Sequence, residues 1–271
     1  MTRPGGDPPA AWAAERPPLS AVIIARDAGP RFAAVLASVA VCREVLVVDS
    51  GSGDGTIELA RAAGARVEHQ PFLGYGPQKR RAVALAAHDW ILSIDADEVL
   101  DAEAQAACRC LDLSDPAACW EIRRRTFVGN REVRHGAWGD ERVLRIFNRT
   151  TADFKDLPVH EQVAAARSPR LLAGSLLHYS FADPIAVLER SLRYARLKAG
   201  IMRGRGESPG PWPLPARAVA AFLKSYVLRS GWRDGGIGFV VALSRAIDST
   251  IPRVLLTEDG GEDSSLRKPK P

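Results

Sequence analysis

Residues 90–98 read Trp-Ile-Leu-Ser-Ile-Asp-Ala-Asp-Glu, and this stretch decides the fold. Its first five residues form a short apolar run, which is typical of a strand buried on both faces of a sheet. The run ends in Asp95, and a second apolar run at 45–48 ends in the same way in Asp49. Ligands of open parallel sheets bind outside the carboxyl ends of the strands. The two aspartates are therefore candidate site residues by position alone.

Outward from this stretch, strands and helices alternate. An apolar run predicts a further strand at 21–25, and Ala-Arg-Val-Glu-His at 65–69 is a plausible third strand. Helically spaced apolar residues predict helices at 30–41, 56–63 and 78–87. Strands that alternate with helices indicate an α/β fold with a parallel sheet covered on both faces. Beyond residue 102 the pattern predicts one more helix and two strands of a mixed extension, over 121–127 and 142–147.

The chain divides into four expected segments. Residues 1–18, rich in Pro, Gly and Ala without a continuous apolar stretch, predict a disordered leader and no signal peptide. We expect an α/β domain that carries the candidate site over 19–182, a basic amphipathic helical region over 183–256, and a charged, disordered tail over 257–271.

Composition places the 271-residue chain among globular proteins, with 46% apolar and 25% charged residues. No window offers the roughly 18 consecutive apolar residues of a membrane span, so we expect a soluble or peripheral protein. The four cysteines lack the paired spacing of a zinc site and are expected to be reduced cytosolic thiols.

Asp95 and Asp97 can turn toward one hard cation of the kind that bridges carboxylates to phosphates. The alternative is that Asp97 and Glu98 only cap a helix that begins near Leu100, because acidic residues favour helix N-termini. The turn 49–55 lacks the last glycine of a dinucleotide fingerprint, and no P-loop pattern occurs in the chain. As a structural element, this turn predicts Asp54 or Ser52 as the N-cap of the next helix.

In combination, these motifs resemble family 2 glycosyltransferases with the GT-A fold, and most closely the β-1,4-glucosyltransferase-like branch of lipopolysaccharide core assembly. The resemblance covers about residues 19–256. It is carried by the segments 47–56 (Val-Val-Asp-Ser-Gly-Ser-Gly-Asp-Gly-Thr), 74–79 (Gly-Tyr-Gly-Pro-Gln-Lys), 89–98, 135–138 (His-Gly-Ala-Trp), 144–147 (Leu-Arg-Ile-Phe) and 159–161 (Val-His-Glu).

The resemblance implies a Rossmann-like mixed sheet flanked by helices and a divalent metal, Mn²⁺ or Mg²⁺, as cofactor. It implies that Asp97 is the direct metal ligand, with Asp95 in the metal shell or on the ribose of a UDP-sugar. Asp49 is implied to contact the base or ribose, and Gln78 and Lys79 the donor side.

An inverting transfer also needs a carboxylate that deprotonates the acceptor hydroxyl. Matching from Trp138 favours Glu141 for this role, although the usual residue at that position is Asp, so Asp140 stays open. His160 with Glu161 is a secondary candidate for orienting the acceptor, whereas His135 and His178 are expected to be structural.

The sequence departs from the family pattern after the first strand. The usual Asn-Glu pair is replaced by Asp27 and Ala28, which puts donor-base contacts at that end in doubt, and Arg80 follows Lys79 where Asn is common.

Positive charge is concentrated near the C-terminus. Between 184 and 255 the chain has twelve Arg and Lys residues and four acidic ones, whereas the net charge of the whole chain is +5. Basic amphipathic helices with tryptophans such as Trp212 and Trp232 favour an anionic membrane surface. The alternative is that their apolar stripes pack on the catalytic domain. Nucleic acid is not expected as a partner, because no recognition motif is visible.

The sequence therefore predicts an inverting, metal-dependent transferase that moves a hexose, glucose by resemblance, from a UDP-sugar to a lipid-linked saccharide such as a lipopolysaccharide core. We expect it on the cytoplasmic face of a bacterial inner membrane. The alternatives are a nucleotidyltransferase of similar α/β fold and a non-catalytic nucleotide-sugar-binding membrane scaffold.

Overall fold

The computed structural model describes residues 16–154, 163–208, 210 and 213–258. The expected leader and tail therefore lie almost wholly outside the described residues. The chain divides into two units. The first comprises 1–124 and 141–178, and the second comprises 125–140 and 179–271.

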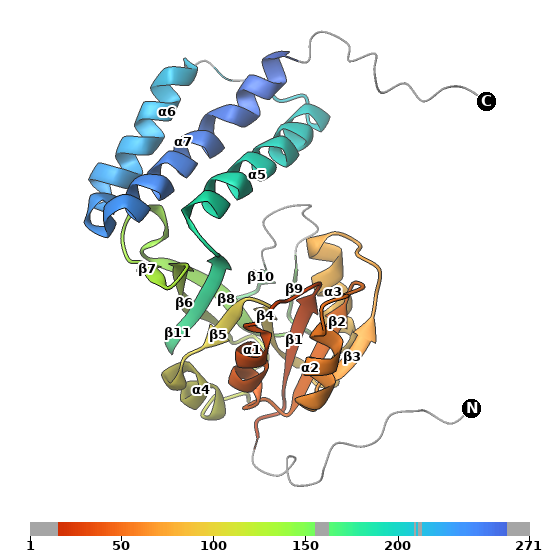
Figure 1. Cartoon of the computed structure of the whole chain (residues 1–271). Coiled ribbons are helices and arrows are strands. Elements are labelled where there is room, and N and C mark those ends of the chain that lie inside the picture. The colour runs from red at the N-terminus through yellow and green to blue at the C-terminus, as the bar shows by residue number, and fades with distance from the viewer. Residues whose placement is uncertain (1–15, 155–162, 209, 211–212, 259–271) are drawn as a thin grey trace, which may run out of the picture. The chain divides into compact units, whose positions relative to one another are not determined.

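The first unit is built on one mixed sheet (Figure 1). Its strands follow the order β3-β2-β1-β4-β8-β6-β11-β5. The first four are parallel to their neighbours, and β8 pairs with β4 in antiparallel fashion. The bounds are β1 Leu19–Ala25, β2 Glu44–Asp49, β3 Arg66–His69, β4 Trp90–Asp95, β5 Glu98–Leu100, β6 Cys119–Val128, β8 Glu141–Asn148 and β11 Arg170–Phe181. The α/β class expected from the sequence, a mixed sheet flanked by helices, is confirmed.

Helices cover both faces of this sheet because side chains alternate along each buried strand. On β1, Leu19, Ala21 and Ile23 join a core with the helices α1, α2 and α4, whereas Val22 joins a second core with α3. The helices are α1 Phe32–Val39, α2 Thr56–Ala62, α3 Tyr75–Leu85 and α4 Ala102–Arg109. A small hairpin of β9 Ala152–Phe154 and β10 Val163–Ala165 accompanies the α3 side, where Phe154 is buried.

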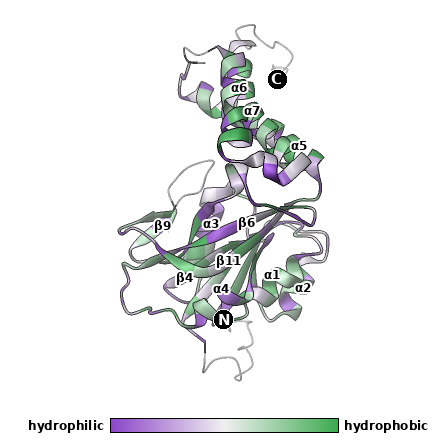
Figure 2. Cartoon of the chain, turned by 90° about the vertical axis from the view of Figure 1, so that its left-hand side faces the viewer, coloured by the Kyte–Doolittle hydropathy of each residue, from purple (hydrophilic) through white to green (hydrophobic). Residues whose placement is uncertain are grey.

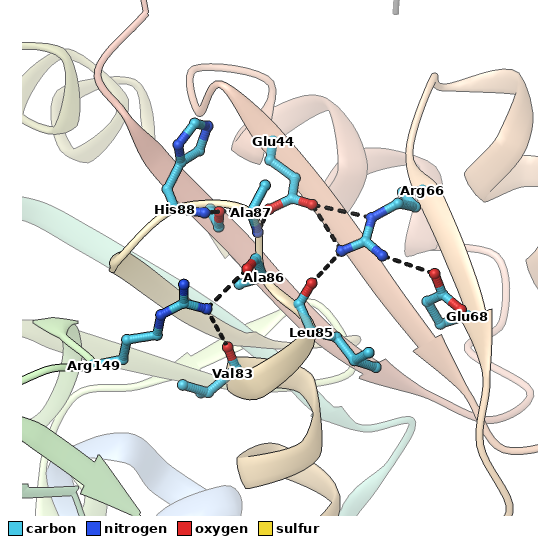
Figure 3. A network of polar contacts seen from close by, with 10 residues as sticks. Glu44, Arg66, Glu68, Val83, Leu85, Ala86, Ala87, His88 and Arg149 are labelled. Carbon is cyan, nitrogen blue, oxygen red and sulfur yellow. Dashed lines mark hydrogen bonds and ion pairs between the residues drawn. The ribbon is translucent and has the colours of Figure 1, made fainter. Parts of the chain in front are cut away.

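A polar network fixes the C-terminal end of α3 (Figure 3). Glu44 accepts hydrogen bonds from the Arg66 guanidinium at 3.0 and 3.1 Å and from the Ala87 backbone N–H at 2.6 Å. Arg66 also donates to the carbonyl of Leu85, and Arg149 donates to the carbonyl of Ala86 at 2.8 Å. Guanidinium groups thus satisfy carbonyls that the end of a helix leaves unpaired. These contacts therefore fix the C-terminal end of α3 relative to the sheet.

The four cysteines form no disulfide. Cys42, Cys108 and Cys119 are buried, and Cys110, which ends α4, is exposed. Burial raises the pKa of all three buried thiols, that of Cys108 to about 12.

The second unit contains three longer helices and short connecting turns. Its helices α5 Pro184–Gly204 and α6 Leu214–Leu223 both pack on α7 Gly235–Glu258. α6 continues into the π-helical turn η3 Lys224–Leu228, and the turn η4 Gly231–Asp234 leads into α7. The strand β7 Arg131–Val133 and the turn η2 Gly136–Trp138 complete the unit. Its core contains the side chains of Val128, Val133, Phe181, Val187, Ile237 and Val241.

One close approach of backbone and one helix cap shape this unit. A Cβ added to Gly238 would lie 1.8 Å from the carbonyl oxygen of Gly231, so α7 passes against η4 at a position only glycine permits. Asp183 caps α5 by accepting from the backbone N–H groups of Ile185 and Ala186. Among the described residues, no helix has the length and apolar content needed to cross a membrane.

Candidate functional site

The aspartates that end β2 and β4 lie on either side of β1. In the sheet register, Asp49 pairs with Ala25 and Asp95 with Ile24, so both residues lie at the carboxyl edge of the sheet, on the two neighbours of β1 and one position apart. This placement follows from the two apolar runs, which end within one residue of the same level of the sheet. The remaining candidates gather around these two positions.

The Asp95 carboxylate is held by two cations. Lys79 Nζ on α3 lies 2.8 Å from Oδ1, and Arg145 Nη2 on β8 lies 2.9 Å from Oδ2. Lys79 and Arg145 are both buried. Burial would raise the pKa of Asp95, but the two cations outweigh it and hold this pKa well below its usual range. Asp95 is therefore an anion whose two oxygens are already engaged.

Glu98 lies at the centre of the same ion network. It is fully buried on β5, accepts from Arg145 Nη2 at 2.5 Å and lies 3.6 Å from Arg124 Nη1. Its other oxygen accepts from the backbone N–H of Asp95 at 3.1 Å. Burial lowers the pKa of Arg145, but Glu98 and Asp95 outweigh it, so the guanidinium stays charged. The Nε of Arg145 has no hydrogen-bond partner among the described atoms.

This placement contradicts the capping alternative for Asp97 and Glu98. The helix begins at Ala102, and its N-cap is Asp101, which accepts from the backbone N–H of Ala104 at 2.9 Å. Glu98 instead belongs to a short strand that pairs with β11, where it lies opposite His178. The capping expectation is wrong because a long-range strand pairing occupies the residues that precede the helix.

The second aspartate of the motif points to a histidine. His178 Nε2 on β11 lies 3.5 Å from Asp97 Oδ2. His178 is buried, and its burial lowers its pKa despite the nearby carboxylates, so the ring is neutral at neutral pH. The side chain of Asp97 is 40% exposed. The sequence predicts a purely structural role for His178. The structure places this histidine beside Asp97, a candidate metal ligand.

A metal site can be built from these two side chains. Neutral imidazole and carboxylate are suitable ligands for a divalent ion such as Mn²⁺. Neighbouring ligand atoms of a six-coordinate ion with bonds of about 2.1 Å lie about 3 Å apart, close to the 3.5 Å observed. No group of three His, Cys, Asp or Glu side chains converges among the described residues, so phosphate and water oxygens would complete the coordination.

Asp49 organises the turn that follows it. Its carboxylate accepts from the backbone N–H groups of Gly51 at 2.8 Å and Ser52 at 3.1 Å, and from the Ser52 hydroxyl at 2.5 Å. Burial raises the pKa of Asp49, but these hydrogen bonds outweigh it and leave the pKa lowered. The side chain is 1% exposed. The hydrogen bonds of Asp49 thus fix the conformation of the turn that follows β2.

The loops after β1 and β2 are tied together. Ser52 Oγ accepts from the backbone N–H of Asp27 at 2.9 Å, and the Asp27 carboxylate accepts from that of Gly53 at 2.8 Å. The N-cap of α2 is Gly55, so the expectation that Asp54 or Ser52 caps this helix is wrong. Asp54 precedes the cap and accepts from the N–H of Thr56 at 3.1 Å. Asp27, which departs from the family pattern, therefore has a structural partner across the two loops.

The side chain of Gln78 forms hydrogen bonds with the segment before α3. Its amide nitrogen donates to Ser50 Oγ at 3.1 Å and to the carbonyl of Gln70 at 3.2 Å, and its oxygen accepts from the N–H of Leu73. The side chain is fully buried. Gln78 and Lys79 thus reach from the first turns of α3 to Ser50, which follows β2, and to Asp95, which ends β4.

The two acceptor-side candidates have different surroundings. Glu141 begins β8 and forms a bidentate pair with Arg124, at 2.6 and 3.1 Å. Through Arg124, Glu141 is connected to Glu98 and so to the network around Asp95. Asp140 is exposed and belongs to the second unit. His160 and Glu161 lie outside the described residues.

His135, in the second unit, has a partner of its own. His135 Nδ1 lies 2.8 Å from Asp234 Oδ1, and the other oxygen of Asp234 accepts from the backbone N–H groups of Arg134 and His135. This arrangement ties the segment before η2 to η4, in keeping with the structural role expected for His135.

Comparison with known proteins identifies the family of the chain. Residues 20–167 match the model of the glycosyl transferase family 2. The lipopolysaccharide core biosynthesis glycosyltransferase LpsC of Rhizobium meliloti is 31% identical over 242 residues, which cover 85% of this chain and 88% of LpsC. An uncharacterized glycosyltransferase of Rickettsia prowazekii is 28% identical over 236 residues, which cover 82% of this chain and 80% of the relative.

Among solved structures, Staphylococcus aureus TarS is similar with a TM-score of 0.42 and 16% identity, over 66% of this chain and 39% of TarS. The family model and the LpsC relative decide the assignment, since the first spans more than half of the chain and the second most of it. The chain therefore belongs to glycosyl transferase family 2 and is a glycosyltransferase with the GT-A fold.

Proposed function

We propose that this glycosyltransferase moves a hexose from a UDP-sugar to a lipid-linked saccharide, with inversion and with a divalent metal. The observation that carries the proposal is the pair of Asp97 and His178, which lies beside the Asp95 network at the carboxyl edge of the sheet. Membership in glycosyl transferase family 2 favours this activity over the nucleotidyltransferase and over the non-catalytic scaffold.

On the donor side, Asp97 and His178 would hold Mn²⁺ or Mg²⁺. The ion, when bound, supplies positive charge to the diphosphate that leaves. Lys79 and Arg145 add cationic charge next to it, and Asp95 keeps both cations in position. Because both Asp95 oxygens are engaged, we assign Asp95 to the support of these cations and Asp97 to the metal.

The nucleoside side is formed by the tied loops after β1 and β2. Asp49 keeps the turn 49–52 in one conformation, and Gln78 keeps residues 70–73 next to it. These groups position the donor through backbone that is ordered before binding, which reduces the entropy lost on association. Asp49 and Gln78 therefore act in donor binding chiefly through the loops they fix.

On the acceptor side, Glu141 is assigned as the general base. A base must be held at a fixed place near the hydroxyl that it deprotonates. The bidentate contact with Arg124 holds the Glu141 carboxylate, which is 34% exposed, in one orientation. Asp140 remains the second candidate on the ground of sequence matching.

The acceptor class is inferred from the relative LpsC, which acts in lipopolysaccharide core biosynthesis. A lipid-linked acceptor also implies an enzyme that works at a membrane surface, in this case the cytoplasmic face of the inner membrane. Glucose is the sugar implied by the resemblance of the sequence motifs.

Thermal unfolding with UDP and Mn²⁺ tests the donor assignment. We expect UDP to raise the melting temperature of the wild type only when Mn²⁺ is present. Asp97→Asn and His178→Gln should each abolish this shift, whereas Glu189→Gln, an exposed carboxylate on α5, should leave it intact. The absence of any UDP shift in the wild type would refute the donor assignment. A shift that needs no metal would refute the metal assignment.

A further inference from the structure

The second unit has an exposed apolar surface on α6 and α7. On α6 and η3, the side chains of Val219, Leu223 and Val227 recur every four residues and are 57%, 45% and 51% exposed. Residues four apart lie on one side of a helix, so the three side chains form one stripe. No residue of α6 is buried, although most of its residues are apolar. Figure 2 shows much of α6 in green, the colour of hydrophobic residues.

A further exposed apolar side chain lies on α7, against the helix that carries the stripe. Phe239 is 47% exposed and contacts Phe222 and Tyr226 of the neighbouring helix, with ring centroids 5.4 and 5.9 Å apart. Beyond the end of η3, Leu228 and Trp232 are 78% and 57% exposed. Several large apolar side chains exposed on neighbouring turns and helices are typical of a binding surface.

The charges along this surface are almost all positive. Lys224, Arg229 and Arg233 are exposed within or next to the stripe. The one acidic residue between 214 and 245 is Asp234, which is engaged by His135 and the backbone N–H of Arg134. The surface therefore offers cations beside apolar side chains without an exposed carboxylate to oppose them.

We propose that Val219, Leu223, Val227, Phe239, Leu228 and Trp232 dock the enzyme in the plane of an anionic lipid bilayer. The apolar side chains enter the region below the headgroups, and the basic side chains reach the lipid phosphates. Tryptophan favours the interface because its ring is apolar and its N–H is polar. No described helix can cross the bilayer, so the helices lie along it.

A second copy of the chain fits this surface less well. A symmetric contact would bring the same patch together from both copies and would place Lys224, Arg229 and Arg233 against their own counterparts. Lysine is also depleted in protein–protein interfaces. An anionic headgroup layer complements the positive charge instead. This inference deepens the proposed function, since it identifies the surface on which a lipid-linked acceptor would be met, but it does not depend on the donor.

Vesicle flotation tests the proposal. We expect the wild type to float with vesicles of phosphatidylcholine and phosphatidylglycerol, and far less with phosphatidylcholine alone. The double variant Leu223→Ser with Val227→Ser should lose flotation. The control is Leu197→Ser on α5, which removes an equally large side chain that is 52% exposed, and it should float as the wild type does.

The charge contribution is tested separately. Each of Lys224→Gln, Arg229→Gln and Arg233→Gln should weaken binding to the anionic vesicles by roughly fivefold, because one basic residue near the surface contributes about 1 kcal/mol. Added salt should reduce the difference between these variants and the wild type.

Three results would overturn the proposal: no flotation of the wild type, binding that ignores lipid charge, or stripe variants that float normally. A dimer in sedimentation that dissociates on Leu223→Ser would assign the surface to a second copy. Flotation is measured without nucleotide, and the UDP shift without vesicles, so each can fail alone. The stripe variants should keep the UDP shift, which also shows that they are folded.

Discussion

Arg145 donates to Glu98 at 2.5 Å, and both side chains are buried, at 6% and 0% exposure. Glu98 is also bonded to the backbone of Asp95 and lies near Arg124, which holds Glu141. One buried carboxylate therefore connects the network around Asp95 to the candidate base. A residue that the sequence suggests as a simple helix cap has a central structural position.

Removal of the Glu98 carboxylate should destabilise the first unit strongly. Glu98→Ala leaves the buried Arg145 guanidinium without its closest anion, and such a loss costs about 3–5 kcal/mol. The matched control is Glu121→Ala, which removes a partner of Arg142 at 3.3 Å on the exposed side of the sheet and should cost less than about 1 kcal/mol. Urea unfolding followed by circular dichroism measures both. Equal losses in the two variants would contradict the central role of Glu98.

The two acceptor-side acids should separate in activity. Glu141→Gln should lower the rate of UDP release with a glycolipid acceptor by on the order of 10²–10⁴-fold, because a general base contributes about this much. Asp140→Asn, in an exposed residue, should change the rate only a few-fold. Both variants should keep the metal-dependent UDP shift. The reverse order of effects would assign the base to Asp140.

Acid should weaken the second unit through Glu132. Its hydrogen bonds from Arg125 and Arg134, at 2.7 and 3.0 Å, lower its pKa from 4.5 to about 2 although burial opposes the shift. Because the folded pKa is the lower one, the stabilisation is present above pH 4.5 and is lost as the pH falls toward 2.

With allowance for solvent screening, this contribution is on the order of 1–2 kcal/mol. Glu132→Gln should therefore lower the free energy of unfolding near neutral pH and make it less dependent on pH in the acid range. Urea titrations of both proteins across this range measure the difference. Parallel pH profiles would show that Glu132 contributes nothing.

Two glycines of the second unit should respond in opposite ways to alanine. Gly238→Ala places a methyl group against the carbonyl of Gly231 and should cost about 1–3 kcal/mol, because backbone must move. Gly200→Ala on α5 meets no atom within 4 Å and should stabilise the helix by about 0.5–1 kcal/mol. Thermal unfolding of the two variants measures the sign of each change. A stabilising Gly238→Ala would refute the close contact of α7 and η4.

The parts of the fold that sequence predicts are those with local causes. The runs before Asp49 and Asp95 predict buried strands because apolar continuity is a property of neighbouring residues. Helix α3, in contrast, begins at Tyr75 rather than near Gln78. Its first turn contains Pro77, which is acceptable where no backbone N–H is needed, and apolar spacing does not reveal it.

The parts that sequence does not predict depend on distant pairings. Glu98 lies in a three-residue strand only because β11, more than seventy residues later, pairs with it. The same pairing brings His178 to Asp97. A histidine within an apolar strand gives no local signal of a partner. Arg145 is a similar case. Its motif Leu-Arg-Ile-Phe can be recognised in the sequence, but its ion pairs with Asp95 and Glu98 cannot be predicted from it.

The distribution of the cysteines makes the native chain suitable for site-specific labelling. Cys42, Cys108 and Cys119 are buried thiols with raised pKa values, whereas Cys110 is exposed at the end of α4. A thiol-reactive dye should therefore modify Cys110 first, because the thiolate is the reactive form and must be reached by the reagent. A fluorophore can thus be attached to the first unit without mutation of any residue.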